Sequence, residues 1–146
     1  MLDPEAFEEL EKTLEQIREA SAEGVAIIVE GKNDEAALRK LGVSGPIYRV
    51  PSGGRNPLNS LSNLADYEEV IVLTDFDEPG NELAVFCERQ LEKMGVDVLS
   101  RLRDRLRNYV RKAVKDIEGV PSFVRSERIS HSENLSELER YRSSGQ

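Results

Sequence analysis

The sequence is poor in the residues that build redox centres and zinc sites. Its 146 residues include one cysteine, Cys87, one histidine, His131, and no tryptophan. A single cysteine cannot form an intramolecular disulfide, which favours a reducing cytoplasmic compartment. One cysteine and one histidine also fall short of the ligands of a usual zinc site. Carboxylates are then the available metal ligands, and they favour a hard cation such as Mg²⁺.

Long apolar runs are missing as well. No stretch approaches the roughly 20 apolar residues that cross a bilayer, so we expect no membrane association. The first five residues are acidic where a signal peptide would be basic and then apolar, so we expect no such leader. A chain with 38% hydrophobic and 33% charged residues is typical of one globular domain. At this length it can bury a core without a disulfide or a metal.

The net charge of −8 is unevenly distributed along the chain. Residues 1–24 hold eight acidic and two basic residues, a net charge of −6. Residues 99–115 hold seven basic residues and one acidic residue, a net charge of +6. The overall acidity therefore does not exclude a polyanionic partner, but it confines such a partner to a local patch.

Apolar runs alternate with helical repeats along most of the sequence. We expect strands over 25–29, 47–50, 70–73 and 96–99, and helices over 3–22, 34–40, 58–64, 79–94 and 101–117. This alternation predicts an α/β fold with a mostly parallel sheet of about four strands and helices on both faces. We predict a single domain over residues 1–125, with a motif core at 23–100 and a basic helix at 101–118. The Ser-, Glu- and Arg-rich residues 126–146 are predicted to form a weakly ordered tail.

Acidic residues follow two of the predicted strands directly. The first strand is followed by Glu30-Gly31-Lys32-Asn33-Asp34, and the third by Thr74-Asp75-Phe76-Asp77-Glu78-Pro79-Gly80. The carboxyl ends of parallel strands meet at one edge of a sheet, and ligands bind there where the strand order reverses. If the strand order is 2-1-3-4, then Glu30, Asp75 and Asp77 face one another across a crevice.

Three carboxylates in a partly desolvated crevice repel one another, and a divalent cation would relieve this repulsion. Mg²⁺ binds through one or two carboxylates together with waters and phosphates, and Mn²⁺ is an alternative. In extended chain, the side chains of Asp75 and Asp77 point the same way. Gly31 and Gly80 would allow close approach of backbone or phosphate, and Lys32 would neutralise a phosphate oxygen.

A structural interpretation of the same acids is also open. Asp77 and Glu78 precede Pro79 at a predicted helix start, where acidic residues stabilise the helix. Asp34 is equally interpreted as an acid in the first turn of its own helix. The combination of a glutamate after one strand with an Asp-x-Asp after its expected neighbour favours the functional interpretation.

The two motifs together resemble the Toprim domain. Glu30-Gly31-Lys32-x-Asp34 is followed about 45 residues later by Asp75-x-Asp77-x-x-Gly80, each after a hydrophobic strand. The resemblance covers about residues 23–100. The Toprim domain is shared by bacterial-type primases, type IA and type II topoisomerases, old-family nucleases, recombination-repair proteins and a ribonuclease that matures ribosomal RNA. The short length is similar to that of the small stand-alone Toprim proteins.

The resemblance implies a Rossmann-like sheet, Mg²⁺ as cofactor and phosphotransfer at nucleic-acid phosphodiesters. It implies that Glu30 is a general acid/base and potential metal ligand, and that Asp75 and Asp77 bind Mg²⁺. Topoisomerases of this family use a tyrosine on a separate winged-helix domain, and primases carry zinc-binding and helicase-contacting regions. Neither kind of region fits this sequence, so we expect no topoisomerase or complete-primase activity.

Two further features are candidates for substrate contacts. The loop Ser52-Gly53-Gly54-Arg55 follows the second strand, and it is equally interpreted as a phosphate-binding loop or a surface turn. In the basic helix, Arg103 and Arg107 fall on one flank of the apolar stripe. Such cations would neutralise a nucleic-acid backbone, or form a solvated face, or pair with the acidic first helix. The candidate substrate-binding residues are Gly31, Asp34, Arg55, Gly80, Arg103 and Arg107.

The leading hypothesis is a Mg²⁺-dependent nucleic-acid phosphotransfer domain of nuclease or RNA- or DNA-processing type. Its candidate catalytic residues are Glu30 and Lys32, and its candidate metal ligands are Glu30, Asp75 and Asp77. The alternative is a non-catalytic module that binds nucleic acid or a protein within a larger complex, or that forms a homodimer. A small phosphate-ligand binder that uses the same crevice is the third interpretation.

Overall fold

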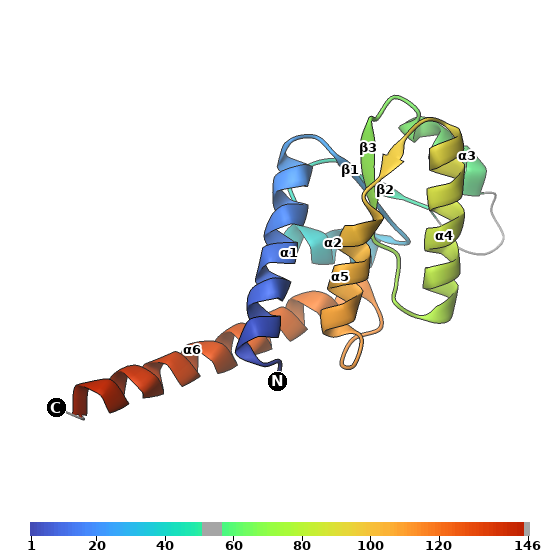
Figure 1. The fold of residues 1–146 in the computed structure, drawn as a ribbon. Helices are drawn as coiled ribbons and strands as arrows, with labels where there is room; N and C mark the ends of the chain where they lie inside the picture. The colour runs from blue at the N-terminus through green and yellow to red at the C-terminus, as the bar shows by residue number, and fades with distance from the viewer. Residues whose placement is uncertain (51–56, 145–146) are drawn as a thin grey trace.

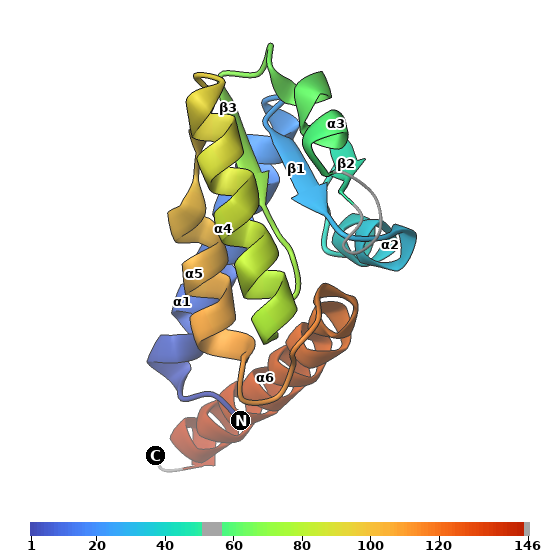
Figure 2. The same ribbon diagram turned by 90° about the vertical axis from the view of Figure 1, so that its right-hand side faces the viewer.

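The fold is an α/β sandwich of three layers, seen here in a computed structural model that describes residues 1–50 and 57–144. A four-stranded sheet lies between two layers of helices (Figures 1 and 2). The strands are β1 (Ala26–Val29), β2 (Ile47–Arg49), β3 (Glu69–Val72) and β4 (Asp97–Val98). The α-helices are α1 (Pro4–Ala22), α2 (Lys32–Lys40), α3 (Pro57–Leu61), α4 (Glu78–Lys93), α5 (Ser100–Val110) and α6 (Val120–Ser144), with short 3₁₀ helices η1 (Ser62–Leu64) and η2 (Ile117–Gly119).

The sheet has the order β2-β1-β3-β4, and every pair of neighbours is parallel. Ile28 of β1 pairs with Tyr48 of β2 on one side and with Val72 of β3 on the other. The predicted α/β class is therefore confirmed, and the observed strand order meets the condition under which Glu30, Asp75 and Asp77 were expected to share one edge. The reversal of strand order lies between β1 and β3, which brings the ends of these two strands side by side.

Both faces of the sheet are buried, as the continuous apolar runs predict. Alternate residues of the strands point to opposite faces. Ile27, Val29, Ile71 and Leu73 pack in one cluster with residues of α1, α2, α5 and α6. Ala26, Ile28, Val70 and Val72 pack in the other with residues of α3, η1 and α4, where Cys87 is fully buried. These two cores fix the sheet edge that carries the acidic motifs.

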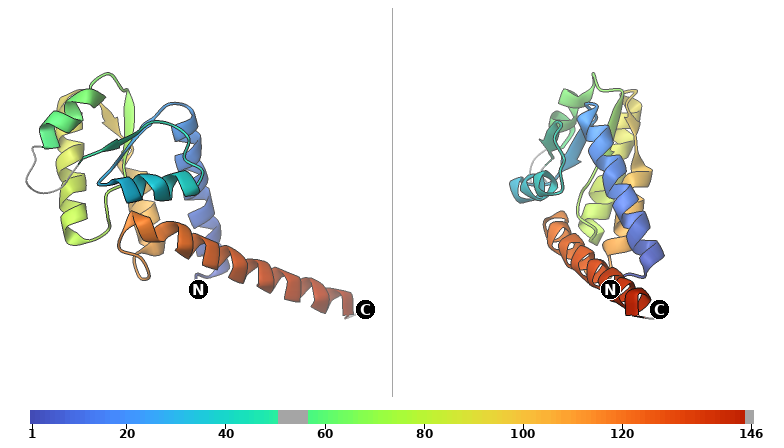
Figure 3. Two further views of the ribbon diagram at one scale, coloured as in Figure 1. Left: turned by 180° about the vertical axis from the view of Figure 1, so that it is seen from behind. Right: turned by 90° about the vertical axis from the view of Figure 1, so that its left-hand side faces the viewer.

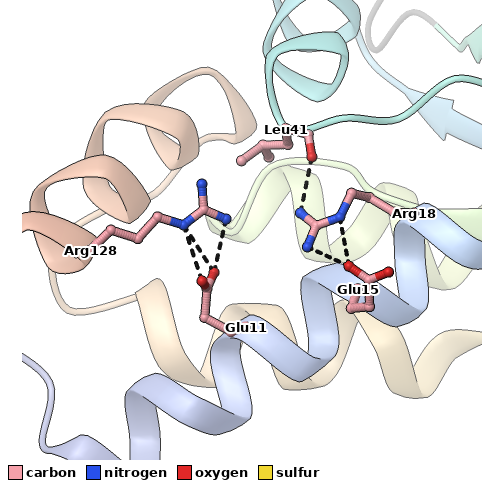
Figure 4. A network of polar contacts seen from close by, with 5 residues as sticks. All are labelled: Glu11, Glu15, Arg18, Leu41 and Arg128. Atoms are coloured by element: carbon pink, nitrogen blue, oxygen red, sulfur yellow. Dashed lines mark hydrogen bonds and ion pairs between the residues drawn. The ribbon is translucent and has the colours of Figure 1, made fainter. Parts of the chain in front are cut away.

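Helix α1 ties together elements that are distant in the sequence. Asp3 caps its N-terminus by accepting the N–H of Ala6 at 2.8 Å. Figure 4 shows Glu11 of α1 paired with Arg128 of α6, Nη2 to Oε1 at 2.9 Å. In the same view Arg18 donates to the carbonyl of Leu41, just past α2. Helix α1 therefore connects α2 and α6 on one face of the sheet.

The C-terminal third of the chain differs from the prediction. Helix α5 ends at Val110, and residues 111–116 form a turn before η2, so the basic helix is shorter than expected. Residues 126–144 belong to α6, so the prediction of a weakly ordered tail is wrong for these residues. His131 is buried there and stacks on Phe7 of α1, with ring centroids 4.1 Å apart. Contacts with α1 thus stabilise this part of α6, although its sequence contains few of the apolar residues that usually form a core.

The distal part of α6 extends away from the body of the domain (Figures 1 and 3). Residues 132–134 and 137–142 are exposed along this extension. Within residues 1–50 and 57–144, no helix combines the length and the apolar character needed to cross a bilayer.

Candidate functional site

The two acidic motifs meet at the carboxyl edge of the sheet. Glu30 directly follows the β1 segment, and Asp75 lies three residues past the end of β3. The backbone N–H of Asp75 donates a hydrogen bond to Glu30 Oε2 at 2.9 Å. The structure therefore brings the glutamate of the first motif onto the Asp-x-Asp loop of the second, as expected for neighbouring parallel strands.

The charges of this cluster act on one another. Burial raises the pKa of Glu30, and the side chains of Asp75 and Asp77 raise it further, while the Asp75 N–H opposes this rise. The charges of Asp75 and Asp77 thus act on Glu30 at the carboxyl edge of the sheet. A carboxylate whose pKa is perturbed in this way is a candidate for acid/base or metal chemistry.

Each of the three carboxylates also has a structural partner. Asp75 Oδ1 accepts the N–H of Ile117 at 3.0 Å. Asp77 Oδ1 accepts the N–H of Gly80 at 2.8 Å as the N-cap of α4, so the capping interpretation of Asp77 holds. One oxygen of each carboxylate therefore accepts a backbone N–H.

The donor set fits the limited demand of Mg²⁺. Across the part of the chain that the structure describes, no group of three or more His, Cys, Asp or Glu side chains is arranged to hold a metal ion. Mg²⁺ needs only one or two carboxylates, since water and phosphate oxygens complete its octahedron. Glu30 and Asp75, which meet through the 2.9 Å contact, are carboxylates of this hard type, and Asp77 adds negative charge beside Glu30.

Asp34 closes the turn between β1 and α2. Its Oδ2 accepts the N–H of Gly31 at 3.0 Å, which is a capping interaction at the start of α2. Burial raises the pKa of Asp34, and the charge of Asp75 raises it further, followed by smaller effects of Glu118 and Asp116. Asp34 is 8% exposed, and its bond to Gly31 fixes the turn that follows β1.

The basic residues of the prediction are separated by the fold. Lys32 is exposed at the N-terminus of α2, next to the acidic cluster. Arg107 is half-buried, and its Nε has no hydrogen-bond partner among the described residues. The loop residue Arg55 lies outside the described residues. Lys32 is therefore an exposed cation within the first motif itself.

Arg103 does not lie on a solvated flank, so the expectation that it contacts substrate is wrong. Its side chain is buried, and it donates from Nη2 to the carbonyl oxygen of Asp75 at 2.6 Å. Helix α5 lies against β3, and this packing turns Arg103 toward the sheet edge. Sequence spacing places Arg103 beside the apolar stripe but cannot show which neighbour covers it.

Comparisons with known proteins give sequence relatives and one structure of similar fold. No family model matches the chain. A UPF0292 protein of Thermococcus onnurineus is 43% identical over 115 residues, which cover 78% of this chain and 82% of the relative. The chain belongs to the UPF0292 family. A UPF0292 protein of Methanocaldococcus jannaschii is 33% identical over 123 residues, or 82% of this chain and 93% of that relative.

The UPF0292 chain also matches a solved structure. A protein from Aquifex aeolicus superposes with a TM-score of 0.59 at 29% identity, covering 75% of this chain and 95% of the other. The two proteins share the fold. Membership of the UPF0292 family thus establishes ancestry and architecture, and the activity has to be argued from the sheet-edge site.

Proposed function

We propose that the chain is a Mg²⁺-dependent phosphotransfer domain that acts on nucleic-acid phosphodiesters, as a nuclease or an RNA- or DNA-processing enzyme. The observation that carries the proposal is the 2.9 Å hydrogen bond from the Asp75 N–H to Glu30 Oε2, which joins motifs 45 residues apart. These motifs resemble those of the Toprim domain. The same combination of residues, sheet edge and mutual charge supports a Toprim-like role.

Glu30, Asp75 and Asp77 would hold the cation through the oxygens that do not accept backbone N–H groups. Bound Mg²⁺ would polarise a phosphoryl oxygen and stabilise the charge that develops in the transition state. Mn²⁺ would replace Mg²⁺ because it accepts the same hard oxygen ligands.

Glu30 would transfer the proton of the attacking or leaving oxygen. Burial and the neighbouring aspartates raise the pKa of Glu30, which moves it toward the range where a general acid/base works best. Lys32 and the N-terminus of α2 lie next to Glu30 in the chain, where a phosphate oxygen would be stabilised by positive charge and by the helix dipole. Gly31 separates these two residues without a side chain.

A non-catalytic module is the second candidate, and the hydrogen bonds of the two aspartates favour it. Asp75 Oδ1 and Asp77 Oδ1 already bind backbone N–H groups, so the acids have a structural task without a cation. Such a module would bind nucleic acid, or a protein partner or a second copy of the chain, within a larger complex. Burial raises the pKa of Cys87 to about 12, which keeps its thiol protonated, and a cytoplasmic location stays a prediction.

A cleavage panel separates the two candidates. Labelled RNA and DNA, single- and double-stranded, are incubated with the wild-type chain in Mg²⁺, Mn²⁺ or EDTA. Asp75→Asn is the test variant, because its amide oxygen still accepts the N–H of Ile117 and spares the fold. Asp97→Asn, an exposed acid at the start of β4, is the control.

The enzymatic proposal expects cleavage by the wild-type and control chains that EDTA abolishes. Asp75→Asn should lower the rate by roughly tenfold or more, the range seen when groups that support a metal are removed. Salt-sensitive binding without cleavage would instead support the module. Nucleotide binding without affinity for polymers would point to a small-ligand binder.

A further inference from the structure

The buried guanidinium of Arg103 is bound to the loop that carries the two aspartates. Arg103 is 5% exposed. Its Nη2 donates to the carbonyl oxygen of Asp75 at 2.6 Å and to Oδ1 of Asn81 at 2.8 Å. Its Nε donates to the carbonyl oxygen of Thr74 at 3.3 Å, and its Cζ lies 5.5 Å from the ring centroid of Phe76. Every contact therefore falls on residues 74–76 or on the first turns of α4.

Among the described residues, neutral oxygens and not carboxylates accept the hydrogen bonds of this buried arginine. Burying a charged group without an ionic partner is costly, and neutral acceptors must satisfy its donors. Here the acceptors are two successive main-chain carbonyls and one amide oxygen. The planar guanidinium offers several donors in a fixed geometry, so these bonds fix the direction of the Thr74 and Asp75 peptide groups.

The fixed peptide groups connect Arg103 to the candidate cation site. Asp75 donates its N–H to Glu30, while its carbonyl accepts from Arg103. Rotation of that residue would therefore break the contact that joins the two motifs. Burial lowers the pKa of Arg103, and the charges of Asp104, Glu88 and Glu30 oppose this shift.

We propose that Arg103 is the positioning residue of the candidate cation site: it holds Asp75 against Glu30 so that their free oxygens converge on one ion. This inference rests on the proposed function. Arg103 reaches the site through the backbone and is too buried to touch a substrate. Its loss should therefore change the affinity for the cation without removing any ligand.

The test is a Mn²⁺ titration followed by calorimetry on Arg103→Lys. Lysine keeps the positive charge, but it cannot reproduce the forked geometry that spans two carbonyls and an amide. Arg105→Lys is the matched control, because Arg105 lies on the same helix, is exposed and reaches only Gln16 at 3.3 Å. Thermal unfolding without metal is measured on each variant to confirm that it is folded.

We expect Arg103→Lys to weaken Mn²⁺ binding by about tenfold or more, the effect typical of groups that orient metal ligands. Arg105→Lys should bind as the wild type does. If the wild type binds Mn²⁺ and Arg103→Lys binds it equally well, Arg103 is only a structural residue and the inference fails. If the wild type takes up no Mn²⁺, the proposed function fails, and this inference fails with it.

A second variant covers the case in which Arg103→Lys does not fold. Asn81→Ala removes one of the three acceptors of Arg103 and leaves every carboxylate in place. The inference expects Asn81→Ala to weaken Mn²⁺ binding by a smaller factor than a direct change of Arg103. Unchanged Mn²⁺ affinity in a folded Asn81→Ala protein would overturn the proposal in that case.

Discussion

Gly31 and Gly80 occupy corresponding places in the two motifs, yet the structure makes different demands on them. At Gly80, an added Cβ would clash with the carbonyl oxygen of Asp75 and press on Oδ1 of Asp77. At Gly31, the nearest atom to an added Cβ would be Oδ2 of Asp34 at 3.8 Å, an ordinary contact. Close approach of α4 to the Asp75 loop, and not backbone conformation, therefore requires glycine at position 80.

Gly80→Ala should destabilise the protein, because the backbone of α4 or of the Asp75 loop must move to admit the methyl group. Overpacking of this kind costs about 1–3 kcal/mol. Gly31→Ala is the control and should change the free energy of unfolding by less than about 0.5 kcal/mol. Urea denaturation of both variants measures the difference, and equal stabilities would contradict the close packing of α4 on the loop.

Glu30 links the site to the pH dependence of stability. Burial, together with Asp75 and Asp77, raises its pKa in the folded state above the value in the unfolded chain. The folded protein then binds the Glu30 proton more tightly than the unfolded chain does. The contribution of this proton to the free energy of unfolding is fully present below the unfolded pKa and is lost as pH rises through the folded pKa. The raised pKa of Asp34 acts in the same direction.

Glu30→Gln should therefore stabilise the metal-free protein at neutral and alkaline pH. Glutamine removes the charge, and its amide oxygen still accepts the Asp75 N–H. We expect a higher urea midpoint than in the wild type above neutrality and a weaker decline as pH rises from mildly acidic values. Exposed Glu68→Gln is the control. A Glu30→Gln protein that is less stable than the wild type at alkaline pH would show that the charged carboxylate does not destabilise the fold.

The C-terminal end of α5 is a helix boundary that the sequence did not predict. The helical repeat over 101–117 predicts one helix, but α5 ends at Val110. The next residues are held by the Asp75 loop: the N–H of Phe76 donates to the carbonyl of Lys115 at 2.7 Å, and the N–H of Ile117 donates to Asp75 Oδ1. Such long-range bonds override local helical preference.

Ile117→Pro tests this support without removing a carboxylate. The substitution deletes the N–H that binds Asp75, whereas proline suits the first position of η2 after the extended Asp116, which has φ −128° and ψ 156°. Ile117→Val is the control, because it retains the N–H and should cost about 0.5–1.5 kcal/mol by lost packing. We expect Mn²⁺ affinity to fall in Ile117→Pro and to stay unchanged in Ile117→Val.

Chemical denaturation accompanies these titrations, so that affinity is compared only between folded proteins. Equal Mn²⁺ affinity in the two variants would mean that the Ile117 N–H does not orient Asp75.

Long-range contacts also explain why α6 was not predicted. Its first half is stabilised by contacts such as the hydrogen bond from the N–H of Leu2 to Glu127 Oε1 at 3.0 Å, which no local sequence pattern reveals.

For the whole molecule, the sequence predicts the sheet and its two helix layers well because strands and helices have local sequence patterns. Continuous β-branched runs mark strands that are buried on both faces, and their alternation with helices predicts the parallel sheet. The carboxyl-edge position of Glu30, Asp75 and Asp77 follows from that topology. The roles of Arg103, Asn81 and Ile117 do not, because their contacts arise only when α5 and η2 pack against β3 and α4.

The fold brings the acidic and the basic segments of the sequence together. The acidic helix α1 and the basic helix α5 pack against the same face of the sheet. Among the described residues, the hydrogen bond between their side chains runs from Arg105 to the uncharged amide of Gln16. The opposite charges are therefore neighbours without direct pairing, and the exposed cations of α5 remain available to solvent and to partners.

We propose that the chain holds a divalent cation between the ends of β1 and β3. The most direct test is a crystal of the wild-type chain soaked in millimolar Mn²⁺, with the anomalous signal of manganese mapped. We predict a peak within coordination distance, about 2.0–2.3 Å, of oxygens from Glu30 and at least one of Asp75 and Asp77. A map with no manganese at these carboxylates, in a crystal where they are open to solvent, would contradict the account.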